Sequence, residues 1–84
     1  MDKLRRHPSG YWCHMVSDYS SKELHSFARR LGLRREQFQE HGRLPHYDLR
    51  SGAREKALSL GAESVTSKEL FRRGREAFLR ERGV

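Results

Sequence analysis

Chemically versatile side chains gather around two short apolar stretches of this sequence. Residues 12–18 read Trp-Cys-His-Met-Val-Ser-Asp, and residues 46–49 read His-Tyr-Asp-Leu. Histidine and aspartate bind metal ions, transfer protons and orient phosphate groups. The candidate functional residues therefore lie in these stretches, and their chemistry depends on how the surrounding elements position them.

His46 and Asp48 form the most compact pair. They are two residues apart, so an extended segment places both on one side with about 7 Å between their Cα atoms. Such a pair can converge on one ion or one substrate group. A metal site requires a third ligand, and His14 would supply it if the two stretches are neighbouring strands. The alternative is a buried histidine with an ordered partner, beside Tyr47 in the core.

Asp18 is the fourth candidate, and it completes a predicted catalytic set with His14, His46 and Asp48. It follows a predicted strand, and open α/β sheets bind ligands at the carboxyl ends of their strands. On a continuous strand, however, Asp18 and His14 are about 13 Å apart and cannot share an ion. The alternative is a turn residue or a helix cap.

Two helices have clear start signals. Ser20 with Glu23, and Thr66 with Glu69, have the spacing of capping boxes. Apolar residues then recur at helical spacing after each cap, and Gly32 is suited to end the first helix. These apolar residues are Leu24, Phe27, Ala28 and Leu31 in the first helix and Leu70, Gly74, Ala77 and Phe78 in the last.

The remaining elements complete a predicted single α/β domain over residues 1–84, with a polar loop at 1–10 and a core at 11–80. Residues 11–17 predict a strand covered on both faces, because their apolar residues do not alternate cleanly. We expect a shorter helix over 33–40, a break at 41–45, a third helix capped by Ser51 and ended by Gly61, and a short strand over 62–66. Alternating strands and helices predict a short, mostly parallel sheet of two or three strands flanked by three or four helices.

The chain is basic, with 18 Lys and Arg against 11 Asp and Glu and a net charge of +7. This charge favours an anionic partner such as nucleic acid or a nucleotide. Its best candidate contact is a cluster at the end of the first helix, where Glu36 is the only acid close by in sequence. The cluster consists of Arg29, Arg30, Arg34 and Arg35. The alternative is a solvated arginine-rich helix face.

Several classes are disfavoured. The single cysteine, Cys13, excludes an intramolecular disulfide framework and a CxxC zinc module, and fits a reducing cytoplasm. No apolar run approaches the roughly 20 residues of a membrane span, so we expect a cytoplasmic protein without a membrane partner. Nucleotide-binding glycine motifs and the common hydrolase motifs are absent. His7, His25 and His41 follow no ligand pattern.

Five segments of the sequence, taken together, resemble those of a known family. They are residues 12–18, 23–28, 31–33, 46–49 and 61–70. Over about residues 11–73 the chain resembles domain-of-unknown-function family 4031, a group of small bacterial and phage proteins. The resemblance implies a bacterial or phage origin and brings no established activity. It also implies six signature positions, namely His14, Asp18, His25, His46, Tyr47 and Asp48.

The start of the chain departs from the family. Such proteins open with a short apolar strand leading into an aspartate, whereas this chain starts Met-Asp-Lys-Leu. Asp2 matches that aspartate with the strand missing. Either the sheet lacks a strand or the start site is set too far downstream, and an exposed sheet edge would invite pairing with another chain.

Three functions follow from these observations. A binding module for nucleic acid or another polyanion ranks first. The second is a small hydrolase or nucleotide-handling enzyme, with a divalent metal as its expected cofactor if His14, His46 and Asp48 converge. The third is a phage-type protein-interaction or inhibitor domain with a protein partner. The distance between His14 and the His46/Asp48 pair separates the second function from the others.

Overall fold

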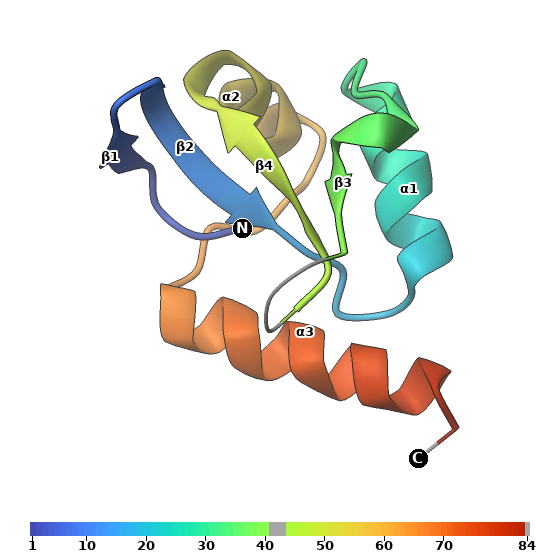
Figure 1. Ribbon diagram of the computed structural model, residues 1–84. Coiled ribbons are helices and arrows are strands. Elements are labelled where there is room, and N and C mark those ends of the chain that lie inside the picture. Colours follow the sequence, from blue (N-terminus) through green and yellow to red (C-terminus); the bar gives the residue numbers. More distant parts are fainter. Residues whose placement is uncertain (41–43, 84) are drawn as a thin grey trace.

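The computed structural model describes residues 1–40 and 44–83, which form a small α/β fold. Their four strands make one antiparallel sheet in the order β1-β2-β4-β3, accompanied by three α-helices and one 3-10 turn at Arg35–Gln37 (Figure 1). The strands are β1 (Arg5–His7), β2 (Gly10–Met15), β3 (Phe38–Gln39) and β4 (His46–Arg50). The helices are α1 (Ser21–Arg30), α2 (Ser51–Ser59) and α3 (Ser67–Glu81).

The expectation of a mostly parallel sheet of two or three strands is wrong. Helix α1 connects β2 to β3, and these two strands run in the same direction, as in a parallel crossover. They are not neighbours, because β4 lies between them and runs antiparallel to both. The two-residue strand β3 lies where the sequence predicts a helix over 33–40. If β3 is left out, the chain passes from β2 through helix α1 to β4, and this order wrongly predicts that β4 runs parallel to β2.

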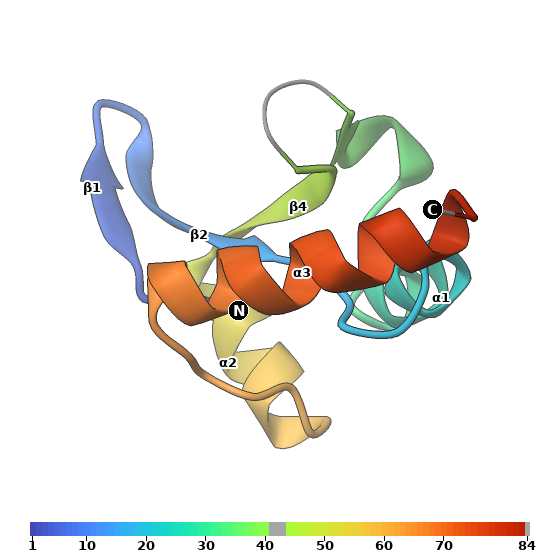
Figure 2. The ribbon, with the colours of Figure 1, turned by 90° about the horizontal axis from the view of Figure 1, so that it is seen from below.

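Only one face of the sheet carries helices within the described part of the chain. Helices α1 and α2 lie on that face, while α3 crosses the end of the sheet (Figures 1 and 2). Cys13, Met15 and Leu49 are buried beneath the helices. The predicted cover on both faces is therefore wrong. The outward residues of β2 include Trp12 and His14, and these large rings disguise the alternation of a sheet with one solvated face.

The predicted caps of the two longest helices are confirmed. The side chains of Ser20 and Thr66 accept hydrogen bonds from the backbone N–H groups of Glu23 and Glu69, respectively. The carboxylate of Glu23 accepts from Ser17 Oγ at 2.9 Å instead of completing a reciprocal box. These caps fix where α1 and α3 begin.

The start of the chain is not the polar loop predicted for residues 1–10. Residues 5–7 form β1, which pairs with β2, and Met1 and Asp2 are buried. Residues 62–66 do not form a strand of the sheet, although Val65 N–H donates to the carbonyl of Met1 at 2.8 Å. The predicted third helix is confirmed as α2, although Ser51 is its first residue and not its cap. Part of the predicted break at 41–45, including His41, lies outside the described residues.

Helix α3 packs through a glycine. A Cβ atom at Gly74 would lie 2.6 Å from Leu44 Cδ2 and 2.9 Å from Val16 Cγ2, closer than side chains normally approach. The small residue therefore lets α3 approach the chain just after β2 and just before β4. In the described residues, none of the helices is both long and apolar enough to cross a membrane.

Candidate metal centre

Three of the predicted site residues meet on the helix-free face of the sheet. His14 on β2 lies directly opposite Asp48 on β4, and His46 lies two residues before Asp48. Asp48 Oδ1 is 3.3 Å from His46 Nε2 and 3.8 Å from His14 Nε2. One ligand atom from each of the three residues lies within 4.8 Å of the others. Antiparallel pairing of β2 and β4 thus brings together residues that are more than 30 positions apart in sequence.

The backbone sets the proton position on His46. Its Nδ1 lies 2.7 Å from the carbonyl oxygen of Leu44. A carbonyl oxygen only accepts hydrogen bonds, so Nδ1 is the donor and carries the proton. In the neutral ring, Nε2 then presents its lone pair toward Asp48, which is the tautomer that a metal ion requires.

The Asp2 side chain sets the proton position on the ring of His14. One carboxylate oxygen accepts from the backbone N–H of His14 at 2.6 Å, and the other lies 2.9 Å from its ring Nδ1. Burial by itself raises the pKa of Asp2, but the ring and backbone hydrogen bonds from His14 outweigh it and hold that pKa below its usual value. Asp2 is therefore a carboxylate, and it directs the Nε2 lone pair of His14 toward Asp48.

Asp2 is itself anchored. Its side chain is only 1% exposed, and its Oδ2 also accepts from Ser67 Oγ at 3.1 Å. Arg5 on β1 donates in turn to Ser67 Oγ. This chain of hydrogen bonds ties the first turn of α3 and the edge strand to the orientation of His14. Outer-shell partners of this kind position metal-binding histidines in proteins.

The geometry suits one divalent transition-metal ion. A tetrahedral zinc ion bound at about 2.0–2.2 Å holds its ligand atoms roughly 3.3–3.6 Å apart, close to the separations from Asp48. The side chains of His14, His46 and Asp48 are 45%, 20% and 36% exposed. Three protein ligands that face solvent leave a coordination position for water or substrate, as in catalytic zinc sites.

The three ligands lie in a broad concavity of about 530 Å³. Its volume falls in the range of pockets that bind small molecules. The residues around the ligands come from the β1–β2 hairpin and are mostly cationic or aromatic. They are Arg5, Arg6, His7, Ser9, Trp12 and Cys13.

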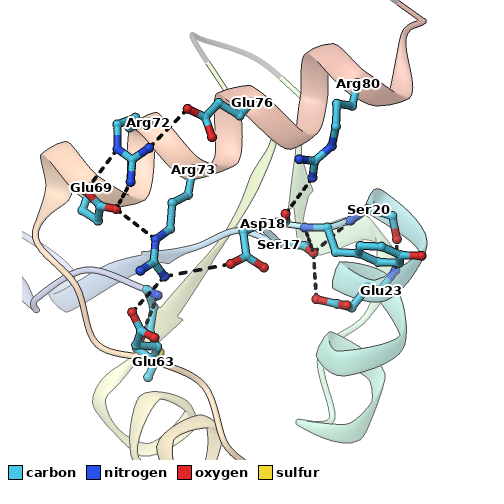
Figure 3. A network of polar contacts seen from close by, with 12 residues as sticks. Ser17, Asp18, Ser20, Glu23, Glu63, Glu69, Arg72, Arg73, Glu76 and Arg80 are labelled. Carbon is cyan, nitrogen blue, oxygen red and sulfur yellow. Dashed lines mark hydrogen bonds and ion pairs between the residues drawn. The ribbon is translucent and has the colours of Figure 1, made fainter.

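Asp18 is not part of this cluster. It lies beyond the end of β2, where its carboxylate is 3.9 Å from the guanidinium of Arg73 and its backbone carbonyl accepts from Arg80 at 2.9 Å (Figure 3). Arg73 also binds Glu63 and Glu69, at 2.8 and 2.9 Å. Asp18 thus joins a network that holds α3 against the loop after β2, consistent with the alternative of a turn residue.

His25 and Tyr47 lie on the opposite side of the sheet from the metal ligands. His25 Nδ1 is 2.9 Å from the hydroxyl of Tyr47, and its ring packs edge-on against Phe38. Burial lowers the pKa of His25 and raises that of Tyr47. Cys13 also faces the core, and burial raises the pKa of its thiol, so it is not poised as a thiolate.

The arginine cluster lies apart from the three ligands, on α1 and the turn after it. All four of its side chains are exposed. Arg30 stacks 5.7 Å over the ring of Phe27, and Arg35 stacks 5.7 Å over Phe38. Arg34 lies 3.7 Å from Glu36. The cluster is thus a surface of its own, separate from the concavity.

Sequence reasoning missed the residues that support the site. Asp2 was singled out only through the family resemblance. No sequence pattern indicated a role for Ser67 or for the backbone carbonyl of Leu44. Ser67 is 65 positions from Asp2, and a backbone carbonyl is the same in every residue. Trp12 could have been identified, since an aromatic residue two positions before His14 shares its face of a strand.

Comparison with known proteins places the chain in a family without an assigned activity. Neither the curated proteins nor the solved structures include a significant match. The model of the family described as "Protein of unknown function (DUF4031)" matches residues 2–77, a range that includes Asp2 and all three candidate ligands. With 76 of its 84 residues matched in this way, the chain belongs to the DUF4031 family.

Proposed function

We propose that this protein is a metal-dependent hydrolase, with His14, His46 and Asp48 holding one divalent transition-metal ion. A single observation carries the proposal: both histidines present Nε2 to the same oxygen of Asp48, and each is held in that tautomer through Nδ1. A buried histidine needs one hydrogen-bond partner. Two histidines with oriented outer partners and converging lone pairs are what a metal site needs.

Hydrolysis is the reaction that this site supports best. A metal ion with three protein ligands lowers the pKa of bound water to about 7 and so generates hydroxide at neutral pH. Hydroxide attacks the electrophilic centre, the bond to the leaving group breaks, and the leaving group takes up a proton. The same ligand types also hold iron in oxygenases, but hydrolysis needs no co-substrate beyond water. The cationic rim of the concavity favours an anionic substrate.

Metal titration tests the proposal directly. Metal-free protein titrated with cobalt(II) should develop visible absorption that saturates at one ion per chain, and zinc should displace it. His46→Ala should weaken binding by at least about 100-fold, because it removes a ligand and not merely an outer partner. His7→Ala is the matched control, since His7 lines the same concavity outside the cluster. Equal losses in the two variants, or no stoichiometric binding, would contradict the proposal.

A second function, nucleic-acid binding, is supported by the arginine cluster. Arg30 and Arg35 lie over aromatic rings within one exposed basic surface. Guanidinium groups contact phosphates, and planar groups at the same surface can stack with unpaired bases. This surface does not depend on the metal ligands, so the two functions are tested separately.

Charge reversal in the arginine cluster is expected to reduce nucleic-acid affinity and its dependence on salt. Arg29→Glu combined with Arg30→Glu should lower the slope of log K against log salt by about one unit for each phosphate that the variant no longer binds. The measurement is a salt series of single-stranded oligonucleotide binding by fluorescence anisotropy. Lys68→Glu combined with Arg75→Glu on α3 is the control for net charge, because it reverses the charge of two exposed residues as well. If it produces the same change, the cluster does not bind nucleic acid specifically.

A further inference from the structure

We propose that the substrate of the metal centre is a nucleoside phosphate, whose phosphate binds at the metal ion and whose base stacks against Trp12. This inference rests on the proposed function and names its substrate class. It comes from the residues that share the open face with the metal ligands.

The sheet register places an aromatic residue next to the ligands. Trp12 pairs with Arg50, and His14 pairs with Asp48 two residues further along β2. Residues two apart on a strand point to the same face with about 7 Å between their Cα atoms. Trp12 is therefore a neighbour of the metal centre on the open face. A group bound at the metal needs only a short spacer to bring a second group to the indole.

The indole is held in place from two sides. Its Nε1–H donates to Ser9 Oγ at 2.9 Å, within the β1–β2 turn. The guanidinium of Arg50 lies 4.7 Å from the ring centroid. The ring is only partly buried and lines the concavity. An aromatic ring fixed at the wall of a binding concavity is a stacking platform for a planar ligand group.

The charge of the concavity selects a phosphate. Arg5, which pairs with Trp12, lines the concavity on the face of the ligands, and among the described lining residues Asp48 is the only carboxylate. A divalent ion would neutralise Asp48 and add further positive charge. Arginine and divalent metal ions are the usual partners of phosphate groups in proteins. A nucleoside phosphate combines the required anion, a ribose spacer and a planar base.

The reaction is hydrolysis of the phosphate ester. The oxygen of the metal-bound water forms a bond to phosphorus, and the bond between phosphorus and the ribose oxygen breaks. One proton of the water passes to the leaving ribose oxygen, and the other remains with the phosphate or solvent. The products are a nucleoside and inorganic phosphate, so atoms and charge balance without a co-substrate.

Trp12 itself reports on the proposal, because it is the only tryptophan in the chain. Adenosine 5′-monophosphate added to zinc-loaded protein should quench tryptophan fluorescence and should be hydrolysed to adenosine and phosphate. Ribose 5-phosphate lacks the base, and its kcat/KM should be about 5- to 150-fold lower, the range expected for loss of one stacked base. Adenosine lacks the phosphate and should bind far more weakly than the monophosphate.

Substitution of Trp12 separates stacking from folding. Trp12→Leu should lower kcat/KM for adenosine 5′-monophosphate to the level of ribose 5-phosphate, while leaving cobalt binding unchanged. Trp12→Phe keeps an aromatic ring and should restore much of the difference. Tyr11→Leu is the matched control, because Tyr11 is an exposed aromatic residue on the opposite face of the same strand.

The outcomes distinguish the two proposals. If the protein binds no metal ion, both proposals are contradicted: the metal-dependent hydrolase and the nucleoside phosphate as its substrate. Protein that binds one ion but hydrolyses adenosine 5′-monophosphate and ribose 5-phosphate equally, without fluorescence quenching, overturns only the nucleoside phosphate. Because the comparison of substrates uses the unaltered chain, it remains decisive even if a Trp12 variant fails to fold.

Discussion

Replacing Asp2 by asparagine is expected to weaken metal binding about 10- to 100-fold while all three ligands remain in place. The carboxylate of Asp2 accepts hydrogen bonds from the backbone N–H of His14, from its ring and from Ser67. Asparagine has only one acceptor oxygen for these donors. An amide NH2 facing Nδ1 of His14 would also favour the tautomer with the proton on Nε2, where it blocks the metal ion. Cobalt titration of the metal-free variant measures the effect.

Ser67→Ala provides the graded control for Asp2→Asn. It removes one of the three hydrogen bonds and leaves the charge and the contact with His14 intact, so its effect on metal affinity should be several-fold smaller. Circular dichroism at the titration temperature shows whether each variant is folded. A folded Asp2→Asn protein with unchanged cobalt affinity would show that Asp2 has a purely structural role.

Leu49→Ala is expected to remove a large part of the stability of the fold. Leu49 is 0% exposed and belongs to the same core cluster as Ala57 of α2. Truncation of a buried leucine costs about 2–5 kcal/mol of unfolding free energy, through reduced burial and the cavity that remains. At about 0.05–0.15 kcal/mol per residue, a chain of this size has roughly 4–13 kcal/mol in total. Leu49 also lies between Asp48 and Arg50, so its truncation should disorder the open face.

Urea denaturation followed by circular dichroism measures this destabilisation. Leu58→Ala on α2 is the matched control, because it deletes the same atoms from an exposed leucine, and its effect should stay within about 0.5 kcal/mol. Cobalt binding should fail in Leu49→Ala under conditions where the variant is unfolded and should survive in Leu58→Ala. Similar midpoints for the two variants would contradict the placement of Leu49 in the core.

Much of the local structure could be predicted from sequence because it depends on near neighbours. Ser20 and Thr66 cap their helices through contacts three residues away. His46 and Asp48 could also be placed on one side of an extended segment from their spacing alone. Side chains alternate between the two faces of any strand, whatever its partners in the sheet. Even the nomination of His14 as a third ligand needed only the condition that the two strands be neighbours.

Long-range pairing could not be predicted in the same way. The strand β3 is only two residues long, too short for a hydrophobic pattern, yet the chain reverses direction between β3 and β4, so that β4 runs antiparallel to β2. The N-terminal residues looked like a polar loop because β1 has no buried side chain. Its place in the sheet comes from pairing with β2 and from the bond between Arg5 and Ser67.

By itself, the sequence determined the helix boundaries at Ser20 and Thr66, the basic charge, and the types of residue available for a site. Only the tertiary structure decided which of those residues meet. It brought His14 to His46 and Asp48, moved Asp18 into a network with α3, and placed Asp2 behind His14. The physical reason is that side-chain direction follows from local backbone geometry, whereas the approach of distant strands depends on how the whole chain buries its apolar residues.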